Sequence, residues 1–399
     1  VPPLRFPEFS GEWKMCTIGE LTTKVGSGVT PRGGEAVYKT EGHPFVRSQN
    51  VGLGNLLLDD IAFIDEETHL RQKSTELQFN DVLLNITGAS IGRSALVDKQ
   101  IVGGNVNQHV CIIRTKENLV PSFICSFLLS NYGQRQIDSF QAGGNRQGLN
   151  FEQIKSIKIT IPSKDEQIKI AKLLRAIDER IATQNKIIEK LQSLIKGLND
   201  HILKNIEGDQ VCFADLGEAY GGLSGKSGDD FGCGDPFITY MNVYQNTYIS
   251  ENDYELVQIA PDEKQNSVQY GDALFTLSSE TPEEVGMGAV YLGKSQKLYL
   301  NSFCFGVHFH GNRVLPQYIA HFISSTSFRK AIYPLAQGST RFNLQKQDFM
   351  RMKFVLPSLE EQKRIATALD ALYNHLANEK LLTEQYLLLK QYLLQQMFI

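Results

Sequence analysis

A long series of regularly spaced apolar residues begins shortly after Pro162. The steps between them alternate between four and three, a 3.5-residue period that is typical of a left-handed coiled coil. The series consists of Ile170, Leu174, Ile177, Ile181, Ile188, Leu191, Ile195, Leu198 and Ile202. Gln184 occupies the one position of this series that is not apolar. It could either fix the register of the coiled coil or be locally solvated. Ser163, with Glu166 three residues later, is typical of a capping box, so the pattern predicts one helix over residues 163–206.

The same helix start occurs again near the other end of the chain. The stretch "IPSKDEQIKIAKLL" at 161–174 aligns without a gap with "LPSLEEQKRIATAL" at 356–369, 195 positions later. Its apolar series consists of Ile365, Leu369, Leu372, Leu376, Leu382, Tyr386, Leu389 and Leu393. Glu379 takes the polar position, and the series resumes one residue early at Leu382, which predicts a three-residue stammer.

Three leucines of this second helix lie outside its apolar series. They are Leu387, Leu388 and Leu394. A helix that carries apolar residues beyond one seam needs a second surface against which to bury them. That surface is either a partner protein or another part of the same chain, and the sequence leaves both open.

The similarity between the two halves extends upstream of the helices. At the same offset, Gly143 matches Gly338, Arg146 matches Arg341, and Leu149 matches Leu344. The stretches "VPSFICSFLL" at 120–129 and "LPQYIAHFIS" at 315–324 also align, and each predicts a helix with proline in its first turn. Further upstream both halves are rich in strand patterns and glycine turns, so the chain is predicted to be a tandem repeat with a period of about 195 residues.

The short connection between the halves predicts how the two helices run. The first helix ends near residue 206, and the second strand-rich part begins near residue 211. So few residues cannot return along a helix of about 60 Å, so the helices are predicted to be antiparallel. The expected fold is α+β, with a globular domain at each end of a coiled coil and pseudo-two-fold symmetry. The predicted domains are 1–162 and 207–357, and the predicted helices are 163–206 and 358–399.

Composition narrows the classes of protein without choosing one. The chain has 399 residues and a net charge of −4, so any contact with nucleic acid has to come from local basic patches. The six cysteines form no CxxC pair, which is typical of reduced cytosolic residues. No apolar run approaches the length of a membrane span, and no signal peptide is evident. We therefore expect a cytoplasmic protein without a membrane partner.

Three stretches resemble catalytic or metal-binding motifs but are incomplete. "YGGLSGKS" at 220–227 has Tyr220 where a P-loop needs glycine. "DPFI" at 235–238 lacks the second proline of a methyltransferase tetrapeptide. The pair His308 and His310 has no third ligand in clear register, and a pair on the strand surface is the better interpretation. We therefore predict no catalytic residue, cofactor or metal.

Polar and glycine-rich loops recur at matching places in both halves. Their side chains are those that bind base edges and phosphates, although each loop taken alone also fits an ordinary solvated turn. The predicted DNA-binding residues are Thr30, Arg32, Arg47, Ser48, Asn50, Arg93, Asn107 and Arg146 in the first half and Lys226, Tyr240, Asn242 and Arg341 in the second. The second half also has acidic residues at Glu280, Glu283 and Glu284, which would repel phosphates but accept a hydrogen bond from cytosine.

Over nearly its whole length the sequence resembles the specificity subunit of type I restriction–modification systems. The resemblance is carried by "GSGVTPRGG", "NDVLLNITGASIGRSAL", "NVNQHV" and "GNRQGLNFEQIKSIKITIPSKDEQIKIAKLL" in the first half. In the second half it is carried by "GSTRFNLQKQDFMRMKFVLPSLEEQKRIATAL". The pattern IPxxxEQxxI, present at 161–170 and again at 356–365 with Leu356 for isoleucine, is fairly specific at the end of such a repeat.

The resemblance implies a non-catalytic, DNA-binding subunit. Each of two target-recognition domains would read one half of a bipartite double-stranded DNA site. The long helices would set the spacing and dock two modification (methyltransferase) subunits, with Leu387, Leu388 and Leu394 as candidate partner-binding residues. Restriction subunits would join through that complex. The alternative from a different class is a tandem-repeat scaffold that binds proteins and has no enzymatic activity.

Overall fold

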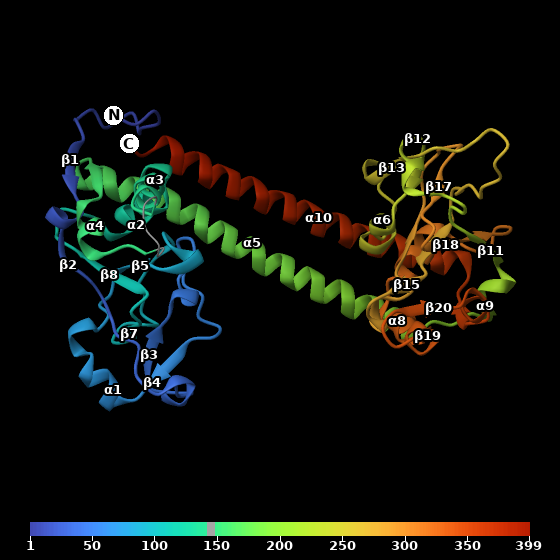
Figure 1. Cartoon of the computed structure of the whole chain (residues 1–399), viewed down its shortest axis with the longest axis horizontal. Coiled ribbons are helices and arrows are strands. Elements are labelled where there is room, and N and C mark those ends of the chain that lie inside the picture. Colours follow the sequence, from blue (N-terminus) through green and yellow to red (C-terminus); the bar gives the residue numbers. More distant parts are fainter. Residues whose placement is uncertain (142–147) are drawn as a thin grey trace. The chain divides into compact units, whose positions relative to one another are not determined.

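The computed structural model describes residues 1–141 and 148–399 (Figure 1). The chain divides into two compact units. Unit 1 comprises residues 1–185 and 381–399, and unit 2 comprises residues 186–380. Each unit therefore takes the first part of one long helix and the last part of the other, as expected when two antiparallel helices are shared.

Unit 1 is built on a four-stranded antiparallel sheet in the order β2-β8-β5-β6. A three-stranded sheet, β4-β3-β7, and the pair β1-β9 complete its strands. The strands are β1 (Lys14–Thr17), β2 (Thr22–Ser27), β3 (His43–Val46), β4 (Ala62–Ile64), β5 (Val82–Asn85), β6 (Ser94–Leu96), β7 (Asn105–Val106), β8 (Val110–Thr115) and β9 (Lys158–Ile161). The helices are α1 (Glu66–Arg71), α2 (Pro121–Leu129), α3 (Asn131–Ser139), α4 (Phe151–Ser156) and the first part of α5 (Lys164–Lys204).

Unit 2 repeats this topology with the sheets β11-β18-β14-β16 and β13-β12-β17 and the pair β10-β21. It adds the small sheet β15-β20-β19. The strands are β10 (Asp209–Cys212), β11 (Gly217–Gly221), β12 (Phe231–Ile238), β13 (Tyr254–Val257), β14 (Ala273–Thr276), β15 (Ser278–Ser279), β16 (Gly288–Val290), β17 (Tyr299–Leu300), β18 (Cys304–Phe309), β19 (Ala336–Gln337), β20 (Phe342–Leu344) and β21 (Lys353–Leu356). The helices are α6 (Tyr240–Gln245), α7 (Pro316–Ile323), α8 (Thr326–Ile332), α9 (Lys346–Met350) and the first part of α10 (Leu359–Gln396).

The repeated helix start is explained by one buried glutamine in each unit. In unit 1 the Oε1 atom of Gln167 accepts a hydrogen bond from the Val120 N–H at 2.9 Å, and its Nε2 donates to the carbonyls of Asn118 and Pro162 at 3.1 Å. In unit 2 the Oε1 atom of Gln362 accepts from the Leu315 N–H at 2.7 Å, and its Nε2 donates to the carbonyls of Arg313 and Pro357 at 2.8 and 2.9 Å. Every partner in unit 2 lies 195 positions after its counterpart. The glutamine therefore joins the helix start to the segment before α2 or α7.

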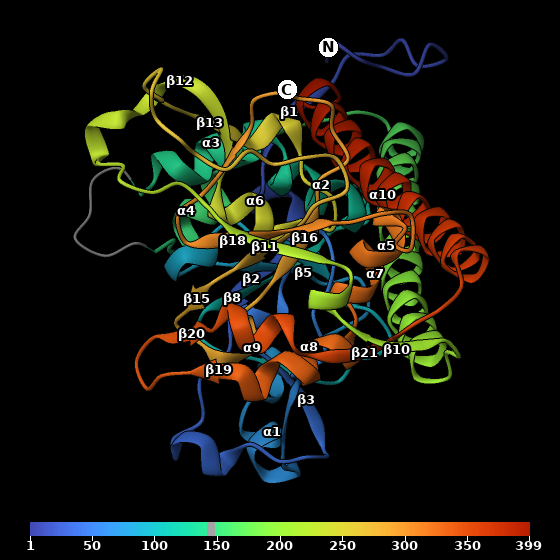
Figure 2. The same ribbon diagram turned by 90° about the vertical axis from the view of Figure 1, so that its right-hand side faces the viewer.

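The long helices pack antiparallel in each unit, as the short connection predicted. In unit 1, Ile177 of α5 and Leu393 of α10 belong to one core, and the Lys390 ammonium lies 2.5 Å from the Asp178 carboxylate. In unit 2, Leu198 of α5 packs on the core that contains Leu369 of α10. Figures 1 and 2 both show the two helices side by side. The seam predicted for α5 is confirmed, and its polar member Gln184 is 5% exposed.

The stammer predicted in α10 is wrong. Leu382 and Leu389 are 37% and 43% exposed, whereas Thr383 is buried and Lys390 faces α5 through its bond to Asp178. The steps of four and three therefore continue unbroken through polar residues. The spacing of apolar residues predicted the wrong seam here because the contact between the helices is an ion pair. The neighbouring leucines therefore lie on the outer face of the helix.

Candidate nucleic-acid interface

In unit 1 the loops predicted to bind nucleic acid meet at one edge of the domain. The Asn107 N–H donates to the Val46 carbonyl at 3.0 Å, which joins the loop after β7 to the end of β3. The Ile86 N–H donates to the His109 carbonyl at 3.0 Å, and the Leu149 N–H donates to the Ile86 carbonyl at 2.9 Å. Segments that are far apart in the sequence therefore form one surface, which we call recognition edge 1 (residues 47–50, 87–93, 105–109 and 148).

Unit 2 forms the same edge with the same backbone bonds. The Asn301 N–H donates to the Ile238 carbonyl at 3.0 Å, the counterpart of the Asn107 bond. The Leu277 N–H donates to the Phe303 carbonyl at 2.8 Å, and the Leu344 N–H donates to the Leu277 carbonyl at 2.9 Å. We call this surface recognition edge 2 (residues 239–244, 278–284, 301–303 and 337–343). Because the same backbone hydrogen bonds form in both units, the edge is a feature of the fold that the two units share.

The glycine-rich loops at 26–34 and 221–228 lie against these edges. A Cβ atom on Gly28 would lie 1.7 Å from the Val106 carbonyl oxygen, and one on Gly222 would lie 2.0 Å from the Asn301 carbonyl oxygen. Only glycine lets the loop pass so close to the strand behind the edge. The glycines therefore have a packing role that brings each loop beside the polar residues.

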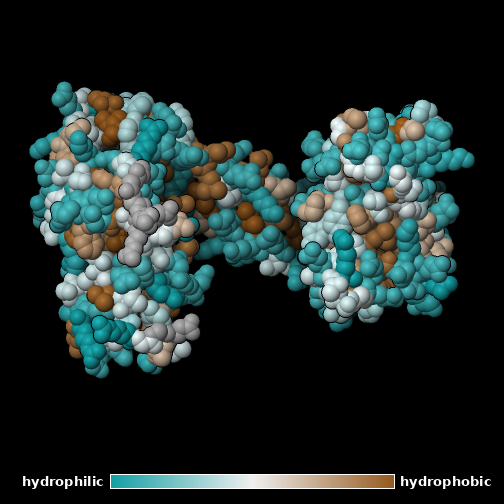
Figure 3. Space-filling model, in the orientation of Figure 1, coloured by the Kyte–Doolittle hydropathy of each residue, from teal (hydrophilic) through white to brown (hydrophobic). Residues whose placement is uncertain are grey.

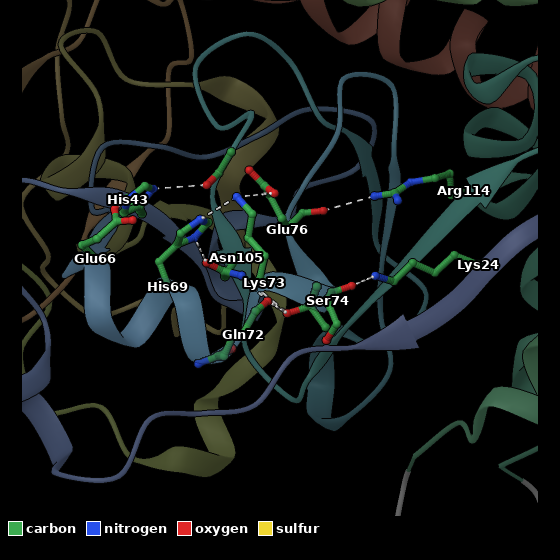
Figure 4. Close-up of polar contacts among 12 residues, drawn as sticks. Lys24, His43, Glu66, His69, Gln72, Lys73, Ser74, Glu76, Asn105 and Arg114 are labelled. Carbon is green, nitrogen blue, oxygen red and sulfur yellow. Dashed lines mark hydrogen bonds and ion pairs between the residues drawn. The ribbon is translucent and has the colours of Figure 1, made fainter.

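A polar cluster behind edge 1 holds one of its loops and the glycine-rich loop that lies against it (Figure 4). Asn105 accepts a hydrogen bond from the ring of His69, with Nδ1 and Oδ1 2.7 Å apart, and its Nδ2 donates to the Gln72 carbonyl at 3.0 Å. The Val29 N–H donates to Gln72 Oε1 at 3.3 Å. His69 is buried and stacks on His43 with a centroid distance of 3.8 Å. The cluster therefore links α1 to the loops at 26–34 and 105–109.

The residues predicted on edge 1 divide into buried supports and exposed side chains. Asn50 is fully buried, and its Nδ2 donates to the Leu57 carbonyl and to Asp60 Oδ1 at 2.9 and 2.8 Å. Asn107 is 7% exposed, and its Oδ1 accepts from the His109 N–H at 3.0 Å. Both asparagines fix the shape of their own loop.

The other predicted residues of unit 1 are more accessible. Arg32 and Arg93 are exposed, and Thr30 and Ser48 are half-buried. The guanidinium of Arg47 donates to the Asp60 carbonyl at 2.7 Å. Arg146 lies outside the described residues.

In unit 2, two predicted residues line one hollow. Tyr240 donates its hydroxyl hydrogen to the Ser278 carbonyl at 2.8 Å, and the Arg341 guanidinium lies 5.6 Å from the centroid of the exposed Phe303 ring. The hollow is lined by Tyr240, Met241, Tyr244, Ser278, Ser279, Glu280, Glu284, Phe303 and Arg341. Aromatic rings, a guanidinium and hydroxyls therefore surround the same space.

The other two predicted residues of unit 2 are engaged within their own domain. Asn242 is 2% exposed, and its Nδ2 donates to the Ser250 carbonyl at 2.8 Å. The Lys226 ammonium is buried and bonds to Glu263 Oε2 at 2.5 Å. Hydrogen bonds from Lys226, then from Gln265, lower the pKa of Glu263 to about 2. Lys226 is thereby held as a loop anchor.

The acidic loop of edge 2 is held by a cation that the sequence analysis missed. The Arg329 guanidinium donates to the carbonyls of Gly286, Glu283 and Val285 at 2.6, 2.7 and 2.6 Å. Burial lowers the pKa of Arg329. Glu284 accepts the Tyr244 hydroxyl at 2.7 Å, and this bond lowers the pKa of the Glu284 carboxyl. The loop thus has an internal positive charge beneath its carboxylates.

Phe303, Tyr244 and Arg329 were missed for an understandable reason. A single phenylalanine before a strand is most often a core residue, and an arginine in a helix is most often a solvated surface residue. Only the repeat could have identified Phe303, because its backbone bond matches that of His109 in the other half. The offset between the two halves changes outside the long helices, which obscures this correspondence in the sequence.

The outer face of α10 is apolar in its second half. Leu387 and Leu388 are 51% and 65% exposed, whereas Leu394 packs partly buried against the core of unit 1. Other exposed apolar residues of this stretch are Leu381, Leu382, Leu389 and Tyr392. Figure 3 shows apolar side chains, in brown, gathered along the surface where Figure 1 draws the long helices.

Residues 1–141 and 148–399 contain neither a metal-binding cluster nor a membrane-spanning helix. No group of three or more histidine, cysteine or acidic side chains in these stretches is arranged to hold a metal ion. His308 instead bonds Asp272 through Nδ1 and Oδ1, which lie 2.7 Å apart. None of the helices described in these stretches has the length and apolar character needed to cross a bilayer.

Comparison with known proteins identifies relatives over most of the chain. The family model of the type I restriction modification DNA specificity domain matches residues 10–193 and 226–385. The specificity subunit of the type I restriction enzyme EcoKI from Escherichia coli is 23% identical over 90% of this chain and 82% of its own length. The scaffold alternative is not favoured by these matches.

Solved structures share the fold. A chain from a study of complex assembly and conformational transition in a type I restriction–modification system has a TM-score of 0.61 at 15% identity and covers 97% of both chains. The S subunit of a type I system from M. genitalium has a TM-score of 0.56 at 14% identity, covering 100% of this chain and 99% of that one. Both similarities support two related mixed helix and strand domains with long helices.

Proposed function

Because the chain belongs to the family of type I restriction modification DNA specificity domains, we propose that it reads a bipartite DNA site with one half-site at each recognition edge. The observation that carries the proposal is the repeated edge itself. Two domains with the same backbone bonds present different side chains, which is the arrangement needed to read two different half-sites with one fold.

Solvent exposure separates the candidate residues into those that contact DNA and those that hold the loops in place. Arg32, Arg93 and Arg341 are exposed on or beside the edges and meet the duplex. The buried asparagines at 50, 107 and 242 hold the loops in shape, and Lys226 anchors its loop through Glu263. Because Glu280 and Glu284 line the same hollow as Arg341, a phosphate would be repelled there and an uncharged base edge would not.

The long helices supply the platform for partner subunits. Leu387 and Leu388 expose about half or more of their surface on the outer face of α10, and burying such side chains stabilises association. We assign this face to a modification (methyltransferase) subunit, and restriction subunits join through the resulting complex. The chain contributes recognition and spacing to that complex and no catalytic group.

The test is to express the chain with its native partner subunits, purify the complex and map methylated bases across a genome. The expected result is methylation at one motif made of two short half-sites with a constant spacer. A duplex with both half-sites should bind with strong salt dependence. A complex that forms without the chain, or methylation without a two-part motif, would contradict the proposal.

A further inference from the structure

One side chain on each edge stands at the same backbone position but has different chemistry. His109 and Phe303 each follow an asparagine turn, in which Asn107 Oδ1 accepts the His109 N–H at 3.0 Å and Asn301 Oδ1 accepts the Phe303 N–H at 2.9 Å. Each residue then accepts the equivalent backbone bond from Ile86 or Leu277. The fold therefore holds this position rigidly and leaves its side chain free to differ.

The two side chains face different partners. His109 Nδ1 lies 2.6 Å from the Thr87 hydroxyl, and its Nε2 lies 3.4 Å from Gln108 Nε2, so this position offers hydrogen-bonding groups. Phe303 has no such group and is 53% exposed in the hollow, with Met241 48% exposed on the same lining. An apolar side chain can distinguish bases in the major groove through the C5-methyl group of thymine.

We infer that Phe303 contacts a thymine methyl group in the second half-site and thereby determines part of its sequence. This inference rests on the proposed function. The Arg341 guanidinium lies 5.6 Å from the Phe303 ring, and successive bases on a strand are about 3.4 Å apart. Guanine is the base that a guanidinium can bind through two hydrogen bonds, so if Arg341 contacts a base, the thymine should lie one or two base pairs from that guanine.

The test uses the complex with its native methyltransferase subunits and the motif mapped for the wild type. Each thymine of the second half-site is replaced in turn by uracil, which lacks only the methyl group. At one position the wild-type complex should bind about fourfold more weakly, the effect of one methyl group leaving an apolar contact. Phe303→Ala should bind the thymine and uracil duplexes equally, and Phe303→Leu should keep part of the difference.

Two controls accompany these variants. Phe231→Ala removes another exposed phenylalanine of unit 2, which packs on Phe237 away from the hollow, and should keep the full response to uracil. The first half-site of every variant should be unchanged, which verifies that the complex is folded and assembled.

Different failures have different meanings. A second half-site without thymine, a wild type that ignores every uracil, or a response that persists in Phe303→Ala overturns the inference and leaves the proposed function intact. A wild-type complex without any two-part motif overturns the proposed function, and the inference with it.

Discussion

The two recognition edges share a framework and differ in the groups they present. Edge 1 has His109 beside a threonine hydroxyl, whereas edge 2 has Phe303 beside the guanidinium of Arg341. The loop of edge 1 is held by Gln134, whose Nε2 donates to the Gly92 carbonyl at 3.1 Å, and the acidic loop of edge 2 is held by Arg329 at the equivalent position. The framework residues position the loops, and the exposed residues are free to diverge.

The difference in loop anchors has an electrostatic reason. Edge 2 has Glu283 and Glu284 on the loop that Arg329 supports, whereas the loop at 87–93 has no carboxylate. The half-buried guanidinium of Arg329 offsets part of the negative charge and satisfies three carbonyls at once. A neutral loop needs only an amide, which is the group that Gln134 supplies.

The shared framework can be broken by removing its buried glutamines. Gln167→Ala and Gln362→Ala should each lower the free energy of unfolding by about 3–4 kcal/mol, because each leaves one N–H and two carbonyls without their partner. Urea unfolding measures the loss, and Gln192→Ala, at an exposed helical position, is the control. Clearly unequal losses would mean that the two starts are not energetically equivalent.

The second expected effect concerns the exposed apolar face of α10, which has polar residues at the equivalent positions of α5. Leu387→Asp with Leu388→Asp should weaken methyltransferase binding by about 3 kcal/mol while the free energy of unfolding changes by less than about 0.5 kcal/mol, because both leucines are exposed. The matched control is Gln192→Asp with Ser193→Asp, the polar equivalents 195 positions earlier. Titration calorimetry compares them, and unchanged binding by the leucine variant would remove this face from the interface.

The substitution Arg329→Gln gives edge 2 the same side chain, a glutamine, that holds the loop of edge 1 at Gln134. The variant should lose about 2–3 kcal/mol of stability, because a glutamine cannot bond all three carbonyls and no longer offsets the carboxylates. Hydrogen exchange over residues 278–286 should accelerate, and methylation mapping should show a relaxed second half-site only. Lys330→Gln, at the next and exposed residue, should change neither property.

Arg341→Ala separates base reading from phosphate binding. Loss of a base contact should cost about 2 kcal/mol and relax one position of the second half-site. A phosphate contact would instead weaken all sequences evenly and reduce the salt slope by about one. Binding at several salt concentrations together with methylation mapping decides between them, and Arg351→Ala is the exposed control.

The smallest expected effect is a pH dependence confined to unit 2. His321 is buried, with Nε2 2.7 Å from Asp370 Oδ1, and burial lowers its pKa below the ordinary 6.5 in spite of that carboxylate. Below about pH 6.5 the unfolded state binds more protons at this histidine than the folded state does, so stability falls as pH falls toward the lowered folded-state pKa. Above that range this histidine contributes no dependence.

Protection factors from hydrogen exchange in α7, corrected for the intrinsic exchange rate at pH 8 and pH 5.5, measure the effect. His321→Gln should remove the difference, and His375→Gln, which alters an exposed histidine, should keep it. An equal loss of protection at pH 5.5 in α2, where Ser126 occupies the equivalent position, would point to a general acid effect instead.

The sequence alone determined the repeat, the two helices and their antiparallel packing. These features depend on local periodicity and on a connection too short for any other course, so they are visible without the tertiary structure. The same reasoning placed polar loops at matching sites in both halves. It misjudged the seam of α10, where Lys390 and Asp178 form the contact that leucines were expected to make.

Only the tertiary structure decided which polar residues are exposed and which are supports. Asn50 and Asn242 have the same chemistry as a base-reading asparagine, and their burial depends on carbonyl groups that folding brings to them. Phe303 and Arg341 are 38 positions apart and meet only because β14, β18 and β20 bring their loops to one edge. A side chain's role here depends on its neighbours in space, and those neighbours come from sheet pairing that no local pattern encodes.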